Sequence, residues 1–241
     1  MLRRVIGTLK TLPRPILWIM VFGGVFLFLF LSVEFFFYTD KKVENHKVRE
    51  DKSLARLSTE EMGRLQEGDI ILRRGYGFFS DMIATHFNDN QYDVTHAGIL
   101  YQKENQWWVI HSLSSKVSEI EGVQEQSLED FLYYSVPNKI MVVRLKGIQK
   151  AEQEQLVRFA QEYVAKKTPF DTKGIIHDDK SLYCTELIWH ILIHKMKKVP
   201  LPKDMEMRKE LFYSMKGMYH PQYFDIIINT YAQTPSVKIE N

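Results

Sequence analysis

An unbroken apolar stretch close to the amino terminus constrains this chain more than any other feature. Residues 16–38 read ILWIMVFGGVFLFLFLSVEFFFY and include one charged residue, Glu34. As a helix, this stretch would extend roughly 35 Å, which is enough to cross the hydrocarbon core of a bilayer. A cleaved signal peptide usually has a shorter apolar region that small residues follow, whereas this one ends in Phe-Phe-Phe-Tyr. We therefore predict an uncleaved, single-pass transmembrane helix.

The orientation of that helix is predicted from the charges on its two sides. The short tail of residues 1–15 carries only basic charges, whereas the far flank mixes basic and acidic residues. Acidic residues contribute little to the positive-inside rule, so the two sides nearly balance. A short basic tail before a large carboxyl-terminal domain nevertheless resembles a signal anchor. We interpret the tail as cytoplasmic and the domain as extracytoplasmic, in the periplasm or at the outer face of a bacterial inner membrane.

The rest of the chain divides into a polar stalk at residues 39–62, a folded domain at residues 63–228 and a tail at residues 229–241. Strand patterns dominate the first half of the domain, at residues 69–72, 94–101, 107–111 and 140–145. The second and third of these form a predicted hairpin. Helical periodicity follows at residues 150–166 and 182–198. The predicted fold class is α+β, a small antiparallel sheet with helices packed against it.

Charge and cysteine content exclude several kinds of function. The 32 basic and 30 acidic side chains nearly cancel, and they form no dense basic stripe, so we expect no nucleic-acid partner. The single cysteine, Cys184, can form neither an internal disulfide nor a multi-cysteine zinc site. It is therefore a buried small side chain or a reactive thiol.

The position of Cys184 agrees with both interpretations. In SLYCTELIWH it begins a predicted helix, where unpaired N–H groups lower the pKa of a thiol and can stabilise an oxyanion. Leu187, Ile188 and Ile191 follow at helical spacing, which also places Cys184 on the buried side of that helix. Helical spacing alone leaves the two possibilities open.

Two histidines of the predicted hairpin are candidates for a base. His96 lies in VTHAGIL and His111 in WWVIHS, on strands that bring opposed side chains to roughly 5 Å. One imidazole would accept the thiol proton and the other would orient it, or both are ordinary strand histidines. His190 and His194 lie four residues apart, but without the acid of an HExxH motif, on a face expected to be exposed. We expect no metal and no cofactor.

Five short motifs occur in an order that is typical of one family. They are GDIIL at 68–72, VTHAGIL at 94–100, WWVIHS at 107–112, PFD at 169–171 and LYCTELIW at 182–189. Over residues 65–225 the chain resembles the YiiX/YebB-like branch of the NlpC-type papain-like cysteine peptidase superfamily. In that branch the chain is circularly permuted, so the histidine strand precedes the cysteine helix.

The resemblance implies a permuted papain-like domain with Cys184 as the nucleophile and His96 as its base. His111 occupies the third, polar position, where close relatives often have a glutamate; a neutral histidine there would orient His96 by a hydrogen bond alone. Tyr183, Thr95 and Asp69 fall in the motifs as candidate substrate-binding residues, although Asp69 is more typical of a residue that fixes a turn.

The resulting hypothesis is a membrane-anchored cysteine hydrolase or acyltransferase. It would cleave an amide or ester bond of a lipid, a lipopeptide or a peptidoglycan peptide through an acyl-thioester on Cys184. Four aromatic residues bear on the choice of substrate: Phe78, Phe79, Trp107 and Trp108. If they lie near the site they would suit a lipid, and otherwise they would belong to the core. The alternatives are a catalytically inactive binding module with the same fold, favoured by a thiol pKa of about 8.5 or above, and a purely structural anchor protein.

Overall fold

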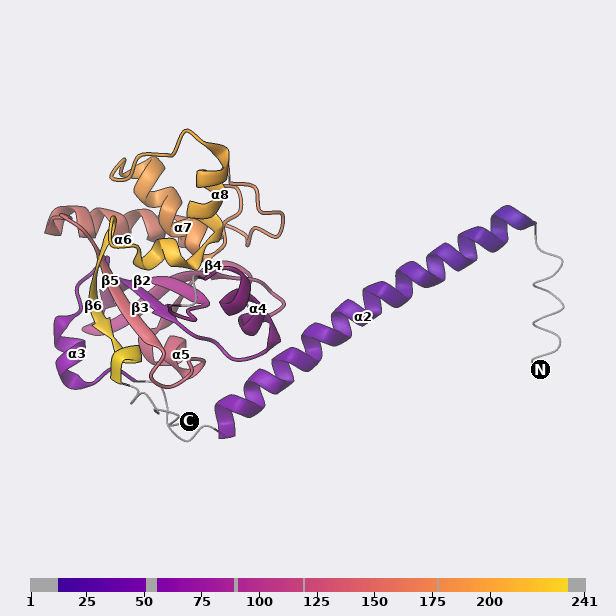
Figure 1. Cartoon of the computed structure of the whole chain (residues 1–241), viewed down its shortest axis with the longest axis horizontal. Coiled ribbons are helices and arrows are strands. Elements are labelled where there is room, and N and C mark those ends of the chain that lie inside the picture. The colour runs from indigo at the N-terminus through magenta and orange to yellow at the C-terminus, as the bar shows by residue number, and fades with distance from the viewer. Residues whose placement is uncertain (1–12, 51–55, 89–90, 119, 177, 234–241) are drawn as a thin grey trace, which may run out of the picture. The chain divides into compact units, whose positions relative to one another are not determined.

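The computed structural model describes residues 13–50, 56–88, 91–118, 120–176 and 178–233. The chain divides into two compact units, Met1–Lys42 and Val43–Asn241, and each is described by itself. Figure 1 shows the elements of both units and labels those for which there is room. The predicted tail at residues 229–241 is described only as far as residue 233, and the predicted tail at residues 1–15 only from residue 13.

The apolar stretch forms a single helix, α2 (Arg14–Glu50), which continues beyond the expected end at residue 38. Within it, Arg14–Lys47 is long and apolar enough to cross a membrane, and no residue of its most apolar window is buried inside the protein. A signal sequence close to the amino terminus meets the same criteria. Length and composition thus make α2 a candidate membrane span.

A six-stranded antiparallel sheet forms the centre of the second unit, with strand order β4-β3-β2-β1-β5-β6. The hairpin of β2 and β3 is confirmed, and its turn residues Glu104 and Asn105 both have positive φ, as the favoured two-residue turn requires. The strands are β1 (Ile70–Arg73), β2 (His96–Lys103), β3 (Gln106–Leu113), β4 (Gly122–Ser127), β5 (Ile140–Leu145) and β6 (Phe224–Asn229).

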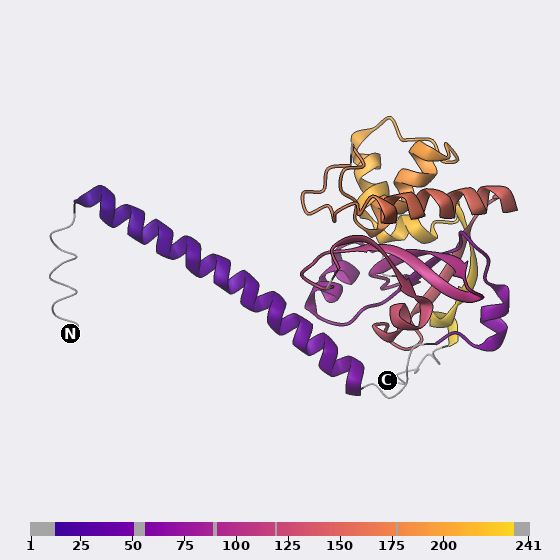
Figure 2. The ribbon, with the colours of Figure 1, turned by 180° about the vertical axis from the view of Figure 1, so that it is seen from behind.

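Helices cover both faces of the sheet, which confirms the α+β fold class (Figures 1 and 2). On one face lie α6 (Lys150–Ala165), α7 (Cys184–His190), which continues as a π-helix to Lys195, and α8 (Met205–Tyr213). On the other lie α3 (Thr59–Arg64) and α5 (Leu128–Tyr133). The remaining described helices are α4 (Phe78–His86) and the 3-10 helices at Met215–Tyr219 and Thr230–Gln233. Each face has its own apolar core.

The folded part begins earlier than the expected residue 63. Leu57 is buried, and Met62 packs against the apolar core on the sheet face that α3 and α5 cover. Ser58 caps α3 reciprocally with Glu61: the Ser58 Oγ accepts the Glu61 N–H and the Glu61 carboxylate accepts the Ser58 N–H. The polar residues just before residue 63, which suggested a stalk, belong to the short, capped surface helix α3.

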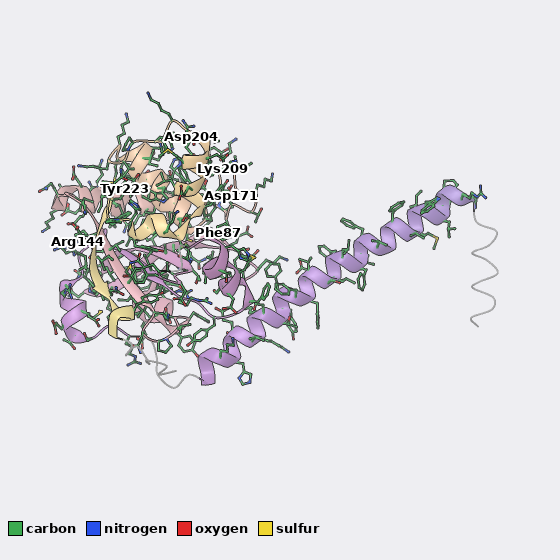
Figure 3. The ribbon with its side chains drawn as sticks, in the orientation of Figure 1. Phe87, Arg144, Asp171, Asp204, Lys209 and Tyr223 are labelled. Atoms are coloured by element: carbon green, nitrogen blue, oxygen red, sulfur yellow. The ribbon has the colours of Figure 1, made fainter. Side chains whose placement is uncertain are left out.

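The Asp69 carboxylate is fully buried at the start of β1. Arg144 donates to its two oxygens from Nε (2.7 Å) and Nη2 (2.8 Å), and the Gln66 N–H donates to the same carboxylate at 2.8 Å. Asp171 lies in the loop that leads to α7, and Figure 3 shows Arg144 on the opposite side of the unit from it. The carboxylate therefore fixes the turn before β1 at a distance from the cysteine helix.

We expect Asp69→Ala to lower the free energy of unfolding by about 3 kcal/mol, because it leaves the largely buried Arg144 guanidinium without its partner. Denaturant unfolding of the full chain in detergent measures the change. Asp225→Ala is the matched control, since its pair with Lys146 is exposed and contributes about 1 kcal/mol or less. Equal losses in the two variants would contradict this account.

Candidate functional site

Cys184 is the first residue of α7, and the preceding chain is anchored to the sheet. The Ser112 hydroxyl of β3 donates to the Leu182 carbonyl oxygen at 2.5 Å, and the Leu182 N–H donates to the Pro169 carbonyl. Glu186 accepts the Tyr183 N–H at 3.3 Å. These contacts determine where α7 begins relative to β3. Cys184 itself is half-buried.

The cysteine helix α7 packs against the two strands of the hairpin, β2 and β3. Pairing of β2 with β3 ends at Ile99 and Ile110, although both strands continue toward His96 and Leu113. The backbone N–H groups of Ala97, directly after His96, of Thr185 and of Cys184 itself all lower the pKa of the Cys184 thiol. The structure thus brings the cysteine helix against the residue that follows the candidate base.

His96 and His111 contact each other directly. His96 Nε2 and His111 Nδ1 are 2.9 Å apart, within hydrogen-bonding distance, and both residues are buried. The two rings also contact Phe131 of α5, at centroid distances of 5.6 Å and 5.3 Å. This bond occupies Nε2 of His96 and leaves Nδ1 as the ring nitrogen that can take a proton from a thiol.

Both imidazoles are neutral at physiological pH. Burial, followed by the charge of Arg73, lowers the pKa of His111 to about 3. The same two causes, with a smaller contribution from His111, lower the pKa of His96 well below 6.5. For His96 to accept a proton at Nδ1, its Nε2 must carry hydrogen and donate to His111 Nδ1. This tautomer is inferred from the chemistry.

The thiol pKa differs from the expectation for a helix start. Burial raises the pKa of Cys184, although three backbone N–H groups and the Arg73 charge lower it. The expected lowering was wrong in direction, because the desolvation of the sulfur exceeds the stabilisation by the helix terminus. The resting pair is therefore a neutral thiol and a neutral imidazole, so that the proton must move as the sulfur attacks.

Arg73 is a functional candidate that the sequence did not indicate. It is the last residue of β1, is paired in register with His96, and is 7% exposed. Arginine at a strand end usually faces solvent, so only the strand register and the three-dimensional packing identify it. No pattern in the sequence pointed to Arg73.

The three predicted substrate-binding residues lie in different surroundings. Tyr183, directly before Cys184, stacks on Tyr213 with a centroid distance of 5.8 Å. Thr95, directly before His96, is buried, and its hydroxyl accepts the Gly75 N–H at 2.9 Å. Asp69 lies at the other end of β1 and contacts Arg144, as described above. The structure places only the first two near the thiol and imidazole.

Two acidic residues near Cys184 in the sequence, Asp171 before α7 and Glu186 within it, influence each other electrostatically. Glu186 is 1% exposed, and burial raises its pKa to about 8, so it is protonated at neutral pH. Asp171 contributes to that rise through its charge, and it accepts the N–H groups of Lys173, Gly174 and Ile175. Because Asp171 is bound this way, its contacts fix the loop before α7.

The second histidine pair differs from the expectation of an exposed face. His190 is buried, 3.7 Å from Asp179, while His194 remains exposed. That prediction was wrong for His190, because the helix lies between the core and the 178–180 loop. Within the described residues, no group of three or more His, Cys, Asp or Glu side chains is arranged to hold a metal ion.

Comparisons with known proteins give one family match. A sequence profile of the family described as permuted papain-like amidase enzymes, YaeF/YiiX, C92 family, matches residues 64–227. The chain is also similar to the crystal structure of metalloprotein yiiX from Escherichia coli O157:H7, with 18% sequence identity and a TM-score of 0.45, over 71% of this chain and 94% of that one. Among curated proteins, no sequence matches the chain significantly.

Proposed function

Because the chain belongs to the C92 family of permuted papain-like amidases, we propose that it is a cysteine hydrolase with Cys184 as the nucleophile and His96 as the general base. The observation that carries this proposal is the packing of the cysteine helix α7 against β2 and β3, the strands of His96 and His111, where His96 Nε2 lies 2.9 Å from the Nδ1 of the buried His111. A thiol, a base and an orienting group therefore come together from α7, β2 and β3.

The geometry supports a mechanism of acyl transfer through the sulfur. His96 Nδ1 takes the thiol proton as Cys184 Sγ attacks the carbonyl carbon of an amide or ester, while the Cys184 N–H at the start of α7 stabilises the oxyanion. The imidazolium returns this proton to the departing amine or alcohol, which leaves an acyl-thioester. Water, deprotonated by His96, then releases the acid and regenerates the thiol. A second nucleophile in place of water would make the enzyme an acyltransferase.

For the substrate, we favour an acyl-bearing lipid or lipopeptide over a peptidoglycan peptide. No residue of the apolar helix α4 is buried, and Phe78 and Phe87 are 59% and 39% exposed. The segment just before α4 approaches Arg73, because a Cβ at Gly75 would lie 3.3 Å from the Arg73 Nη1. Trp107 and Trp108 lie near the turn of the hairpin, away from His96, and do not support a lipid site.

We also propose that α2 anchors the domain to a membrane, with the domain on the extracytoplasmic side. The length and composition of the helix support the anchor. The basic tail before it supports the orientation. An anchored hydrolase would act on substrates in or next to the bilayer.

Vesicles that carry the full-length protein test both proposals. The protein is reconstituted into phosphatidylcholine vesicles, and its co-flotation with them is the first readout. We then expect release of fatty acid from acyl lipids in the vesicle, with no cleavage of a muramyl tetrapeptide in solution. Cleavage of the peptide alone would move the substrate to the cell wall. No cleavage of either, and no acyl-enzyme, would favour the inactive binding module, with which the raised thiol pKa also agrees.

A further inference from the structure

A buried arginine lies beside the two histidines, and the mechanism above leaves it without a role. Arg73 pairs in register with His96, and its Nη1 donates to the Tyr134 carbonyl at 2.6 Å. Its guanidinium carbon is 4.9 Å from the centroid of the Phe131 ring. The same ring contacts both His96 and His111, so the cation and the two imidazoles surround one aromatic side chain.

The neighbouring Arg74 shows how a structural arginine is held in this fold. It is 8% exposed, similar to Arg73, but its guanidinium pairs with the carboxylates of Asp81 and Asp93. Arg73 Nε, by contrast, is buried and has no hydrogen-bond partner within the described part of the chain. A buried cation with an unsatisfied donor is costly for stability, which points to a functional reason for its position.

Resting on the assignment of Cys184 and His96, we propose that Arg73 is a positioning residue that keeps His96 in its neutral, proton-accepting form and stabilises negative charge on the Cys184 sulfur. The Coulomb field of a permanently charged guanidinium acts on both groups at once. It opposes a proton on the imidazole and favours the loss of one from the thiol. The enzyme would then keep its base available in mildly acidic surroundings.

The charged and titratable groups around the site agree with this role. After burial, the Arg73 charge is the next cause that lowers the pKa values of His96 and His111, and it also lowers the pKa of Cys184. Burial lowers the pKa of Arg73 itself to about 10, which Glu44, Cys184 and Tyr134 raise in part. The guanidinium therefore stays charged below pH 9, across the range in which the dyad works.

Removal of the cation gives a signature that a structural role does not. Without Arg73, the pKa values of both His96 and Cys184 should rise. Activity should then be lost at a higher pH on the acid side, where His96 becomes protonated. Alkylation of the thiol, which requires the thiolate, should also need a higher pH. A merely structural arginine would lower activity at every pH and leave both transitions in place.

The experiment compares four variants in the full-length protein: Arg73→Gln, Arg73→Met, Arg73→Lys and the control Arg74→Gln. The acid limb of kcat/KM for a chromogenic acyl ester and the pH profile of iodoacetamide alkylation are measured for each. In the two neutral variants, we expect two midpoints to rise by about one pH unit: that of the acid-side fall in kcat/KM and that of the rise in alkylation. Arg73→Lys and Arg74→Gln should retain the wild-type limbs, the control because its charge is already paired.

Thermal melts establish which variants are folded. Unshifted limbs in a folded Arg73→Gln or Arg73→Met would overturn the proposal, even if activity falls. If neither neutral variant folds, Arg73→Lys still tests the proposal: both transitions moving to higher pH in a folded variant that keeps the charge would overturn it. Failure of the proposed function is a separate result, because the wild-type protein would then form no acyl-enzyme at Cys184.

Discussion

Cys184→Ala should lower kcat/KM for a chromogenic acyl ester by about 10^4-fold or more, to the background rate in buffer. Without the thiol, no acyl-thioester can form, and the N–H groups around the sulfur have no nucleophile to support. Because Cys184 is the only cysteine of the chain, the variant has no second thiol to replace it. Stopped assays with full-length protein in detergent measure the loss.

Cys184→Ser is the companion variant. It nearly keeps the size of the side chain, but a hydroxyl is much harder to deprotonate than a thiol. We expect it to fold like the wild type and to be nearly as inactive as the alanine variant. Wild-type rates in either variant would remove Cys184 from the mechanism.

His96→Gln should lower kcat/KM by about 10^3-fold, since the thiol pKa is raised and a base must remove the proton during attack. Glutamine has a similar length and can still bond to His111, so packing changes little. His111→Gln should have a smaller effect, because that residue only orients the base through the 2.9 Å contact. Rates at several pH values, normalised to folded protein, measure both effects.

His194→Gln is the matched control for these variants. His194 lies in the π-helical segment that continues α7, ten residues after Cys184, and it is exposed. Its loss should leave the rate unchanged. A larger loss in His111→Gln than in His96→Gln would mean that the roles of the two histidines are exchanged.

Regular local patterns are what made part of this structure predictable. The β2–β3 hairpin, α6 and the beginning of α7 follow from alternation, helical spacing and turn residues, all of which are local properties. The sequence did not indicate β4, whose polar GVQEQS has only one large apolar residue, Val123. Nor did it indicate β6, which reaches the sheet from the far end of the chain to pair with β5.

The site was predictable to a similar extent. Cys184, His96 and His111 could be proposed as candidates from short motifs, because each lies at a recognisable helix start or strand position. Arg73 could not, since its relation to His96 exists only through the pairing of β1 with β2. The direction of the thiol pKa depends on burial by elements far apart in sequence, which no local pattern records.

The intermediate on the sulfur tests the central claim most directly. Wild-type protein is mixed with the acyl ester, quenched in acid within the first turnover, digested and analysed by mass spectrometry. We expect the mass of one acyl group on the peptide that contains Cys184. Neutral hydroxylamine should remove this group, as it does a thioester, and the group should be absent from Cys184→Ala. Turnover with no acyl group on that peptide, or with the acyl group on another side chain, would contradict it.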